Sequence, residues 1–335
     1  MTVMLPVPAG YAGKRVLIAG GLGFIGSSLA HRLVALGADV WIVDSLDSRY
    51  GGNTANLEGI QDRVKLTLGD AGDDATLAPL LEGVAVVFNL AAQVSYIDSN
   101  RMPFTDLDLN CRAQLTLLEA VRRMTPQARV VFASSRLVLG TICRTPVTEE
   151  HPTNPRSLYA IHKLTAEKYH QMYADVHGLH TAIVRLANPY GARQQIKHDK
   201  YSLPGWFMRL AMEGKPITVF GDGAQLRDYV YIADVVDAFL RVGLLDGSSG
   251  EVFNCGSGTA TRFADMAEAV VGAVGRGKIN YVPWPADYER VETGDVLLDI
   301  DKLRRRTGWS PTVSLGEGIA DMVRYYADRF HRYAT

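Results

Sequence analysis

The densest glycine cluster of the chain constrains its fold more than any other feature. It occupies residues 19–26 (AGGLGFIG), and Gly20, Gly23 and Gly26 have the spacing G-x-x-G-x-x-G. The cluster follows a short apolar run at 15–19, which predicts a strand, and opens a predicted helix at 24–36. A sharp strand-to-helix turn without side chains lets backbone N–H groups and a helix N-terminus face a pyrophosphate. The cluster therefore predicts a dinucleotide-binding turn.

An acidic residue stands where such a turn needs one. Asp44 ends the next apolar run, 18 residues beyond Gly26. A carboxylate at this distance accepts hydrogen bonds from the hydroxyls of an adenosine ribose. It also disfavours a 2′-phosphate, so the pattern predicts NAD as the cofactor and not NADP.

Strand and helix patterns alternate along the first half of the chain. Uninterrupted β-branched runs, which are typical of strands covered on both faces, occur at 15–19, 40–43, 64–68, 84–90, 129–133 and 181–186. Helical patterns lie between them at 24–36, 73–81, 103–124 and 157–177. This alternation predicts an α/β fold, a Rossmann-type doubly wound parallel sheet.

The pattern changes after about Asn188, where prolines, aromatic residues and shorter helical segments follow, and a last amphipathic helix is predicted near 315–330. We expect an NAD-binding Rossmann domain over 1–188, with parts of 225–260. Most of 189–335 is expected to form a smaller C-terminal α/β region that binds the substrate.

Composition excludes several kinds of partner. The 35 Lys and Arg residues almost balance the 36 Asp and Glu residues, which argues against nucleic-acid or anionic-membrane binding.

The three cysteines, Cys111, Cys143 and Cys255, are far apart and form no C-x-x-C pair, so we expect no disulfide framework, no metal site and a reducing cytoplasm. The apolar N-terminus contains Pro6 and Pro8 and is interpreted as a short tail, not a signal peptide. No uncharged run approaches the ~20 residues that span a bilayer.

A tyrosine and a lysine form a candidate catalytic pair. Tyr159 and Lys163 stand at i and i+4 of the predicted helix 157–177, so they share one face. A nearby ammonium group lowers the pKa of a phenol and makes it a usable base near neutral pH. Ser134 and Ser135 end the fifth predicted strand, and ligands of this architecture bind at the carboxyl ends of the strands. A serine hydroxyl there can bond a substrate oxygen.

Together these residues resemble the extended short-chain dehydrogenase/reductase family, specifically its nucleotide-sugar epimerases and dehydratases. The resemblance covers nearly the whole chain. It extends to Gly69-Asp70, Asn89-Leu90-Ala91-Ala92-Gln93, Asn110, Ser134-Ser135-x-x-Val138-x-Gly140, Arg185-Leu186-x-Asn188-Pro189-Tyr190-Gly191 and Arg227-Asp228-Tyr229-Val230.

The resemblance implies a role for each matching residue. Tyr159 is the expected base, Lys163 holds the nicotinamide ribose and tunes the tyrosine, and Ser135 assists at the sugar hydroxyl. The implied NAD contacts are Gly20, Gly23, Phe24, Ile25, Gly26, Asp44, Asp70, Ala71, Leu90, Ala91, Ala92, Gln93, Asn110, Tyr159, Lys163 and Pro189. The implied nucleotide-sugar contacts are Ser135, Arg136, Asn188, Arg227 and Arg290. A homodimer through the helices 103–124 and 157–177 is also implied.

Two departures from the family pattern narrow the reaction. The 4,6-dehydratases of the family carry Asp-Glu after the catalytic threonine, where this chain has Arg136 and Leu137. Leucine accepts no proton, so dehydration is disfavoured, and so is the related decarboxylation. We expect C4 epimerisation, in which Tyr159 takes the 4-OH proton, a transient 4-keto sugar forms and the bound NAD is recycled. Arg136 either pairs with a C6 carboxylate of the sugar or points to solvent or a local carboxylate.

Other interpretations remain open. The same tyrosine and lysine would serve a C2 epimerase of a CDP-linked deoxysugar or a reductase of 4-keto nucleotide sugars. A non-catalytic NAD-binding scaffold is an interpretation from a different class, since fold does not fix function.

The segment 194–207 has two interpretations: it is either a loop that stacks on the base and covers the sugar or a subunit-contacting or surface loop. His162, between the tyrosine and the lysine, is expected to be structural.

Overall fold

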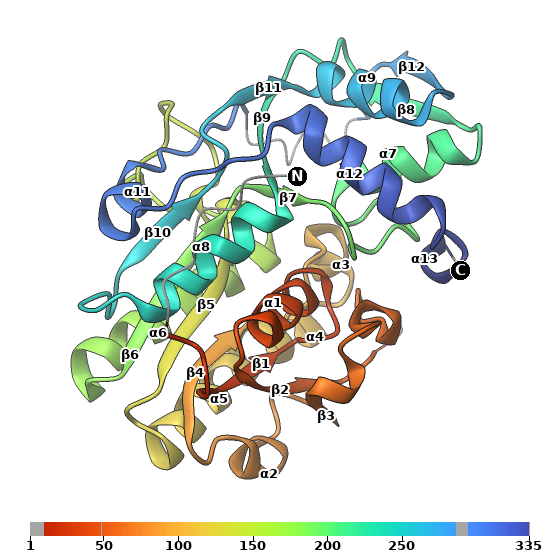
Figure 1. The fold of residues 1–335 in the computed structure, drawn as a ribbon. Helices are drawn as coiled ribbons and strands as arrows, with labels where there is room; N and C mark the ends of the chain where they lie inside the picture. Colours follow the sequence, from red (N-terminus) through yellow and green to blue (C-terminus); the bar gives the residue numbers. More distant parts are fainter. Residues whose placement is uncertain (1–9, 48, 286–293, 335) are drawn as a thin grey trace.

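The fold is built on a seven-stranded, all-parallel sheet (Figure 1). The computed structural model describes residues 10–47, 49–285 and 294–334. The strands of the sheet are β1 (Arg15–Ala19), β2 (Asp39–Asp44), β3 (Val64–Leu68), β4 (Val84–Asn89), β5 (Arg129–Ser135), β6 (His180–Leu186) and β10 (Val252–Cys255). Their order is β3-β2-β1-β4-β5-β6-β10, so the direction of winding reverses between β1 and β4. The predicted Rossmann-type α/β fold is thereby confirmed.

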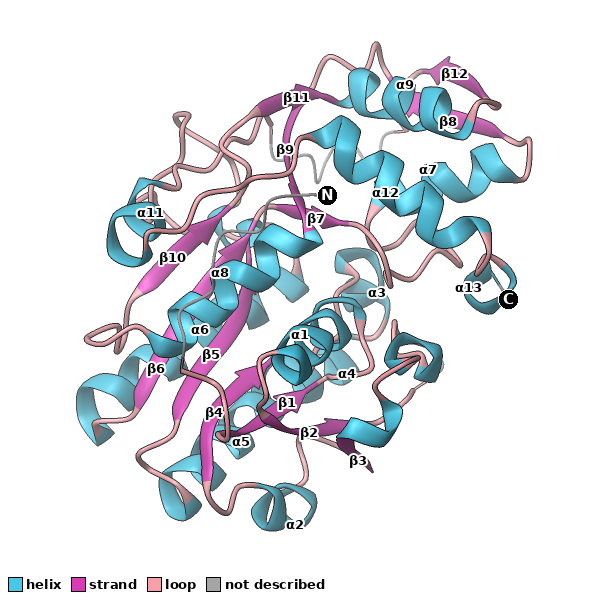
Figure 2. Ribbon diagram, viewed as in Figure 1, coloured by secondary structure: helices cyan, strands magenta, loops and turns pink. Residues whose placement is uncertain are grey.

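Helices cover both faces of this sheet (Figure 2). Helices α1 (Phe24–Ala35) and α8 (Ile232–Leu244) pack together on one face, and α5 (Ala113–Met124) and α6 (Leu158–His177) pack together on the other. The surroundings of strand β1 explain why its sequence is apolar from Val16 to Ala19. Val16 and Ile18 belong to the core on one side, Leu17 and Ala19 to the core on the other, and all four are fully buried. Both faces of the sheet therefore need apolar residues.

Two predicted helices differ from the structure. The segment 73–81 forms only α2 (Asp74–Leu77) and a 3-10 turn (Ala78–Leu80), because Pro79 lacks the N–H that would continue the α-helix. The segment 103–124 is divided into α4 (Pro103–Leu107), a π-helical turn (Asp108–Arg112) and α5. Such turns within helices are frequent at functional sites. Here the turn carries Asn110.

The remaining elements form a second layer of structure above the carboxyl ends of the main sheet (Figure 1). Strands β7 (Asn188–Tyr190), β9 (Leu226–Tyr231) and β11 (Ala260–Arg262) make one small sheet, and β8 (Pro216–Phe220) pairs with β12 (Lys278–Val282). The helices of this part are α7 (Leu203–Met212), α9 (Phe263–Val274), α11 (Asp301–Thr307), α12 (Leu315–Ala327) and α13 (His331–Ala334). The last predicted amphipathic helix ends at Ala327, and Ser314 and Glu317 form a capping box at its start.

Within the described ranges, no helix has the length and apolar character needed to cross a membrane.

Candidate active site

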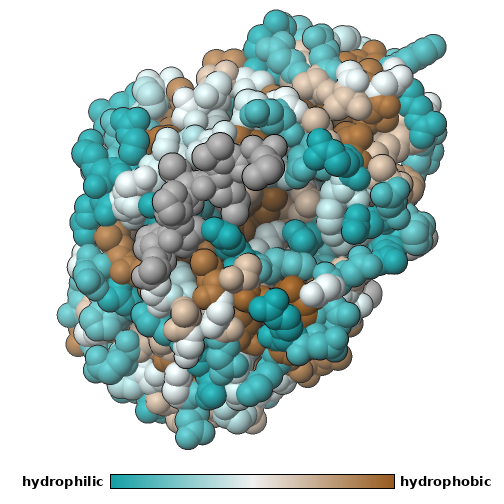
Figure 3. Space-filling view, in the orientation of Figure 1, coloured by the Kyte–Doolittle hydropathy of each residue, from teal (hydrophilic) through white to brown (hydrophobic). Residues whose placement is uncertain are grey.

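A pocket of about 1050 Å³ lies between the main sheet and the second layer. It extends from the glycine turn after β1, along the ends of β4 and β5, to β9 and the segment after β12. Figure 3 shows a hollow near the middle of one face of the molecule, with apolar residues in its wall. This volume is at the upper limit for small-molecule pockets, which suits two ligands bound side by side.

The glycine turn is shaped by close backbone packing. Gly20 has a φ of +82°, and a Cβ there would lie 2.8 Å from the backbone nitrogen of Ala91. A Cβ on Gly26 would lie 2.2 Å from the carbonyl oxygen of Gly20. No side chain caps the start of α1, and Gly23, Phe24, Ile25 and Gly26 line the pocket. The first N–H groups of α1 are therefore suited to a pyrophosphate, as the dinucleotide prediction requires.

Asp44 lies at the pocket wall at the end of β2. Its Oδ2 accepts from the Leu22 N–H at 2.9 Å, and its Oδ1 accepts from the Leu46 N–H at 2.8 Å. Burial raises the pKa of this carboxyl, and the two N–H donors act against that rise. An ionised carboxylate has about four acceptor positions, so Asp44 retains capacity for the hydroxyls of a ribose. Asp70, after β3, also lines the pocket and accepts from the Gly72 N–H at 2.7 Å.

Tyr159 and Ser135 meet at the carboxyl end of β5. Ser157 caps α6 by accepting from the Ala160 N–H, which places Tyr159 in the first turn of the helix. The Tyr159 side chain is almost fully buried, and both Tyr159 and Ser135 line the pocket. Burial raises the pKa of Tyr159, the neighbouring Ser135 side chain lowers it, and the charge of Asp106 raises it further. The expectation of a lowered phenol pKa is therefore wrong for the protein without ligands, because desolvation outweighs the neighbouring groups.

Lys163 lies one helical turn beyond Tyr159 and is also buried. Its Nζ donates to the Ala133 carbonyl at 3.0 Å and lies 4.7 Å from the centre of the Phe132 ring. Burial lowers the pKa of Lys163 to about 8, against the opposing influence of the Asp106 and Glu167 carboxylates. Both members of the predicted pair thus reach one wall of the pocket.

The residues predicted for the nucleotide sugar lie at the other end of the pocket. Arg136 Nε donates to Asn188 Oδ1 at 3.2 Å, and Asn188 Nδ2 donates to the Asp228 carbonyl at 2.9 Å. Arg227 is almost buried on β9, and its Nη1 donates to the carbonyls of Leu226 and Gly294. Arg290 lies outside the described residues. Its role stays a prediction.

Of the predicted site residues that the structure describes, most line this pocket, and two do not. Those on the wall are Gly20, Gly23, Phe24, Ile25, Gly26, Asp44, Asp70, Ala71, Leu90, Ala91, Ala92, Ser135, Arg136, Tyr159, Lys163, Asn188, Pro189 and Arg227. Gln93 and Asn110 are instead buried behind the wall, where both donate to Asp106 Oδ2, at 2.8 and 3.1 Å. Their part in cofactor binding stays a prediction.

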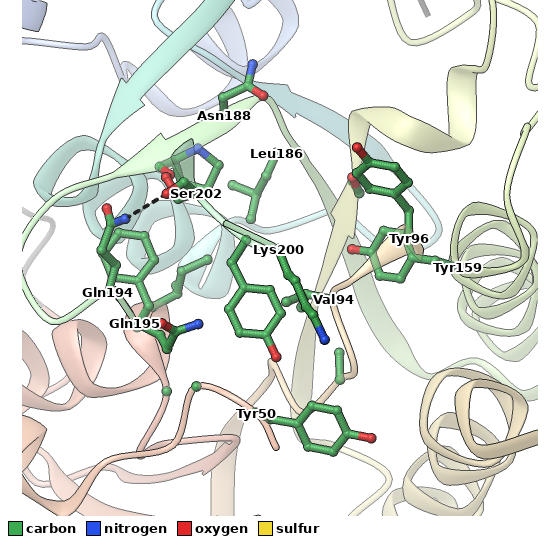
Figure 4. Close-up of a pocket in the computed structure, with 18 of the residues that line it drawn as sticks. Tyr50, Val94, Tyr96, Tyr159, Leu186, Asn188, Gln194, Gln195, Lys200 and Ser202 are labelled. Carbon is green, nitrogen blue, oxygen red and sulfur yellow. Dashed lines mark hydrogen bonds between the residues drawn. The ribbon is translucent and has the colours of Figure 1, made fainter. Parts of the chain in front are cut away.

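The segment 194–207 faces the pocket. Figure 4 shows Gln194 and Gln195 on one side of the pocket and Tyr96 and Tyr159 on the other. Lys200 Nζ lies 2.9 Å from Asp98 Oδ2 on α3 (Tyr96–Arg101), so the segment is tied to the opposite wall. This arrangement favours the ligand-covering interpretation of the segment.

Sequence reasoning missed several residues of the wall, among them Arg156, Tyr229 and Trp284. Arg156 stands three residues before Tyr159, and Tyr229 follows Arg227 closely in a motif already identified. Their proximity in the sequence to predicted site residues could therefore have identified both as residues of the wall. Trp284 comes from the segment after β12 and reaches the pocket only through the tertiary fold. No group of three or more His, Cys, Asp or Glu suited to a metal occurs among the residues that the structure describes.

Comparisons with known proteins identify relatives over nearly the whole chain. The model of the NAD dependent epimerase/dehydratase family matches residues 16–256. The chain is 36% identical over 320 residues to UDP-glucose 4-epimerase of Mycolicibacterium smegmatis, covering 94% of this chain and 99% of that one. A solved UDP-glucose 4-epimerase from Thermotoga maritima, with UDP-glucose, is 30% identical with a TM-score of 0.86, covering 94% of this chain and 99% of that one. A dTDP-glucose 4,6-dehydratase from Streptomyces venezuelae, solved with NAD bound, is 27% identical with a TM-score of 0.86, covering 95% and 98%.

Proposed function

The chain belongs to the NAD-dependent epimerase/dehydratase family, and on that premise we propose that it interconverts the C4 epimers of a nucleotide-diphosphate sugar. NAD is the cofactor of this family, and the relatives act on nucleotide sugars. We propose that the cofactor stays bound and is recycled in each turnover.

One observation carries this proposal. A single pocket joins the glycine turn and Asp44 to the Ser135–Tyr159 pair and then to Asn188 and Arg227. NAD bound along the first part would present its nicotinamide to Tyr159. A nucleotide sugar bound from the opposite end would present its ring to the same tyrosine, and the buried Arg227 guanidinium suits its diphosphate.

The chemistry assigned to the chain is proton transfer and orientation. Bound NAD supplies the hydride acceptor and, after oxidation of the sugar, the hydride donor. Tyr159 receives the 4-OH proton as the carbonyl forms and returns it as the carbonyl is reduced. Ser135, on the same pocket wall as Tyr159, orients that oxygen. Lys163, as an ammonium group in the same wall, stabilises the phenolate.

The wall around Tyr159 favours epimerisation over dehydration. Elimination of water from the sugar needs a base for the C5 proton and an acid for the departing hydroxyl. Arg136 and Leu137 follow Ser135 on the pocket wall, and neither serves as such a base. The described acidic residues of the wall are Asp44, Asp47, Asp70 and Asp199, none of which comes from β5 or α6.

A homodimer is part of the proposal. Exposed apolar side chains gather on α4, α5 and α6, the helices that the family resemblance assigns to subunit contact. They are Phe104, Leu107, Leu115, Met124, Ile161, Met172 and Val176, of which Phe104 is 79% exposed and Val176 69%. Apolar surface of this kind on neighbouring helices is typical of an interface. The cytoplasmic location stays a prediction.

The test is turnover by the NAD-loaded protein on a panel of UDP-, dTDP- and CDP-linked hexoses, with products resolved by NMR. We expect a C4 epimer without added cofactor, and a loss of about 10²–10⁴-fold in rate for Tyr159→Phe. A C2 epimer would identify the CDP-deoxysugar alternative, and stoichiometric consumption of NADH would identify a reductase. Inactivity of the NAD-loaded protein on the whole panel would favour the scaffold, and full activity of Tyr159→Phe would overturn the mechanism.

A further inference from the structure

A buried asparagine joins the glycine turn to the segment that covers the pocket. Asn56, in the 3-10 turn Thr54–Leu57, is 1% exposed. Its Nδ2 donates to the Leu22 carbonyl at 2.8 Å and to the Arg193 carbonyl at 3.3 Å. Leu22 lies inside the glycine turn, and Arg193 directly precedes the segment 194–207. One amide group therefore contacts both the proposed cofactor turn and the cover of the pocket.

The C-terminal end of the chain completes the bonding of this amide. The Tyr333 hydroxyl, on α13, donates to Asn56 Oδ1 at 2.7 Å, across 277 positions of the sequence (Figure 1). Tyr325 bonds the same hydroxyl at 2.7 Å, and the Tyr326 ring packs edge-on against the Tyr333 ring. The Tyr326 hydroxyl in turn donates to the Gln194 carbonyl at 2.6 Å, at the start of the covering segment. The last two helices thus hold the asparagine and the cover together.

These contacts fix the backbone of the glycine turn on both sides of one residue. Asp44 Oδ2 accepts from the Leu22 N–H at 2.9 Å, and the Leu22 carbonyl accepts from Asn56 and from the Asn53 N–H at 3.1 Å. Gly23, the next residue, is the N-cap of α1 and lines the pocket. The peptide that leads into the pyrophosphate-binding end of the helix therefore cannot rotate without breaking buried hydrogen bonds.

A turn that is fixed in this way favours ligand binding. A ligand that meets a backbone already in the binding conformation does not have to supply the free energy of ordering it. We propose that Asn56 is a positioning residue for bound NAD: its amide, seated by Tyr333, holds the glycine turn in the shape that receives the pyrophosphate and holds the covering segment against it. This inference rests on the NAD site of the proposed function, and it is independent of which carbon of the sugar reacts.

The chemistry of the asparagine side chain suits this role. The two carbonyls can only accept and the Tyr333 hydroxyl donates, so the partners of Asn56 need an amide that does both and they fix which way it faces. The amide also carries no charge that would repel a pyrophosphate. An aspartate of the same size would turn an oxygen towards two carbonyl oxygens and would leave both without this donor.

The chain offers a matched control for a buried asparagine. Asn254 on β10 has no exposed surface, and its Nδ2 donates to the Val147 carbonyl at 2.9 Å. Strand β10 lies at the edge of the main sheet opposite to β3, and neither of these two residues belongs to the described wall of the pocket. Asn254→Asp therefore removes a buried amide donor without touching the glycine turn.

The test compares the release of NAD with the stability of the fold. Asn56→Asp and Asn254→Asp should both lower the free energy of unfolding of the NAD-free protein in urea. Asn56→Asp alone should release NAD faster, by about tenfold, measured as the NAD that remains on the protein at successive times after transfer to an NAD-consuming enzyme. Tyr333→Phe, which leaves Asn56 Oδ1 without its donor, should release NAD about threefold faster. Its control is Tyr11→Phe, which removes a buried bond to the Leu240 carbonyl and should release NAD at the wild-type rate.

Three results would overturn the inference. The first is a wild-type rate of NAD release in Asn56→Asp. The second is an equal acceleration in Asn254→Asp, which would make lost stability the cause. The third is a wild-type rate in Tyr333→Phe, and this variant decides alone if Asn56→Asp does not fold. No sugar is present in the measurement, so the expected rates in a protein without epimerase activity would leave this inference standing and reject the proposed function.

Discussion

Glu167 accepts two hydrogen bonds from Arg185, at 2.9 and 2.7 Å, where the glutamate side chain has no exposed surface. The same carboxylate accepts from the Ser134 hydroxyl at 2.6 Å. Glu167 lies on α6 and Ser134 on β5, so this cluster fixes the helix of Tyr159 against the strand of Ser135. The placement of Tyr159 relative to Ser135 thus depends on a buried ion pair between the same helix and the neighbouring strand β6.

We expect Glu167→Gln to destabilise the protein strongly. The amide keeps the size of the side chain but leaves the buried Arg185 guanidinium without its counter-charge, and breaking a buried pair in this way costs about 3–5 kcal/mol. Urea unfolding of the NAD-free protein measures this loss. The control is Arg304→Gln, which removes an exposed pair with Asp301 and should cost no more than about 1 kcal/mol. Equal losses in the two variants would contradict the structural role of Glu167.

Local patterns in the sequence predicted the parts of the site that depend on neighbouring residues. The turn at Gly20–Gly26 and the pair Tyr159 and Lys163 are set by spacing within one strand–turn–helix unit or one helix, and the three spaced glycines of the turn line the pocket together with that pair. The contact between Asp106 and His162 joins residues 56 positions apart, and no pattern at that separation marks it. The same holds for Lys200 and Asp98, 102 positions apart. Such contacts are determined by how the helices pack, which a single sequence does not display.

The pKa of Lys163 predicts a decline of activity at alkaline pH. Burial lowers this pKa to about 8, so the ammonium group is lost as the pH rises through that value. In the proposed mechanism, the protonated form is the one that would stabilise the phenolate and donate towards the nicotinamide ribose. We therefore expect kcat/KM to fall above about pH 8, by up to tenfold per pH unit. Lys168→Met, on the exposed side of the same helix, should keep the wild-type profile. A flat profile to pH 10 would show that Lys163 is not needed as a cation.

Charged substitutions on α4 and α6 are expected to separate the subunits. Phe104→Glu with Ile161→Glu places two carboxylates on the exposed apolar surface proposed as the interface. Desolvating those charges in a dimer would be costly, so the variant should sediment as a monomer. Leu68→Glu is the control, because Leu68 is 61% exposed on the edge strand β3, away from these helices. A wild-type protein that sediments as a monomer at micromolar concentration would reject the proposed dimer.

The ion pair between Lys200 and Asp98 is expected to slow the release of NAD. Lys200 belongs to the segment that covers the pocket, Asp98 is 13% exposed on α3, and Tyr201 extends the same connection by donating to the Arg49 carbonyl at 3.2 Å. Asp98→Asn removes the charge that holds this segment across the opening. A loss of about 1 kcal/mol from such a pair corresponds to about a fivefold faster loss of NAD, measured as the NAD that remains on the protein at successive times after transfer to an NAD-consuming enzyme. Lys215→Met, which removes an exposed pair with Glu213, should release NAD at the wild-type rate. An unchanged rate in Asp98→Asn would mean that the segment 194–207 covers the pocket without restraining the cofactor.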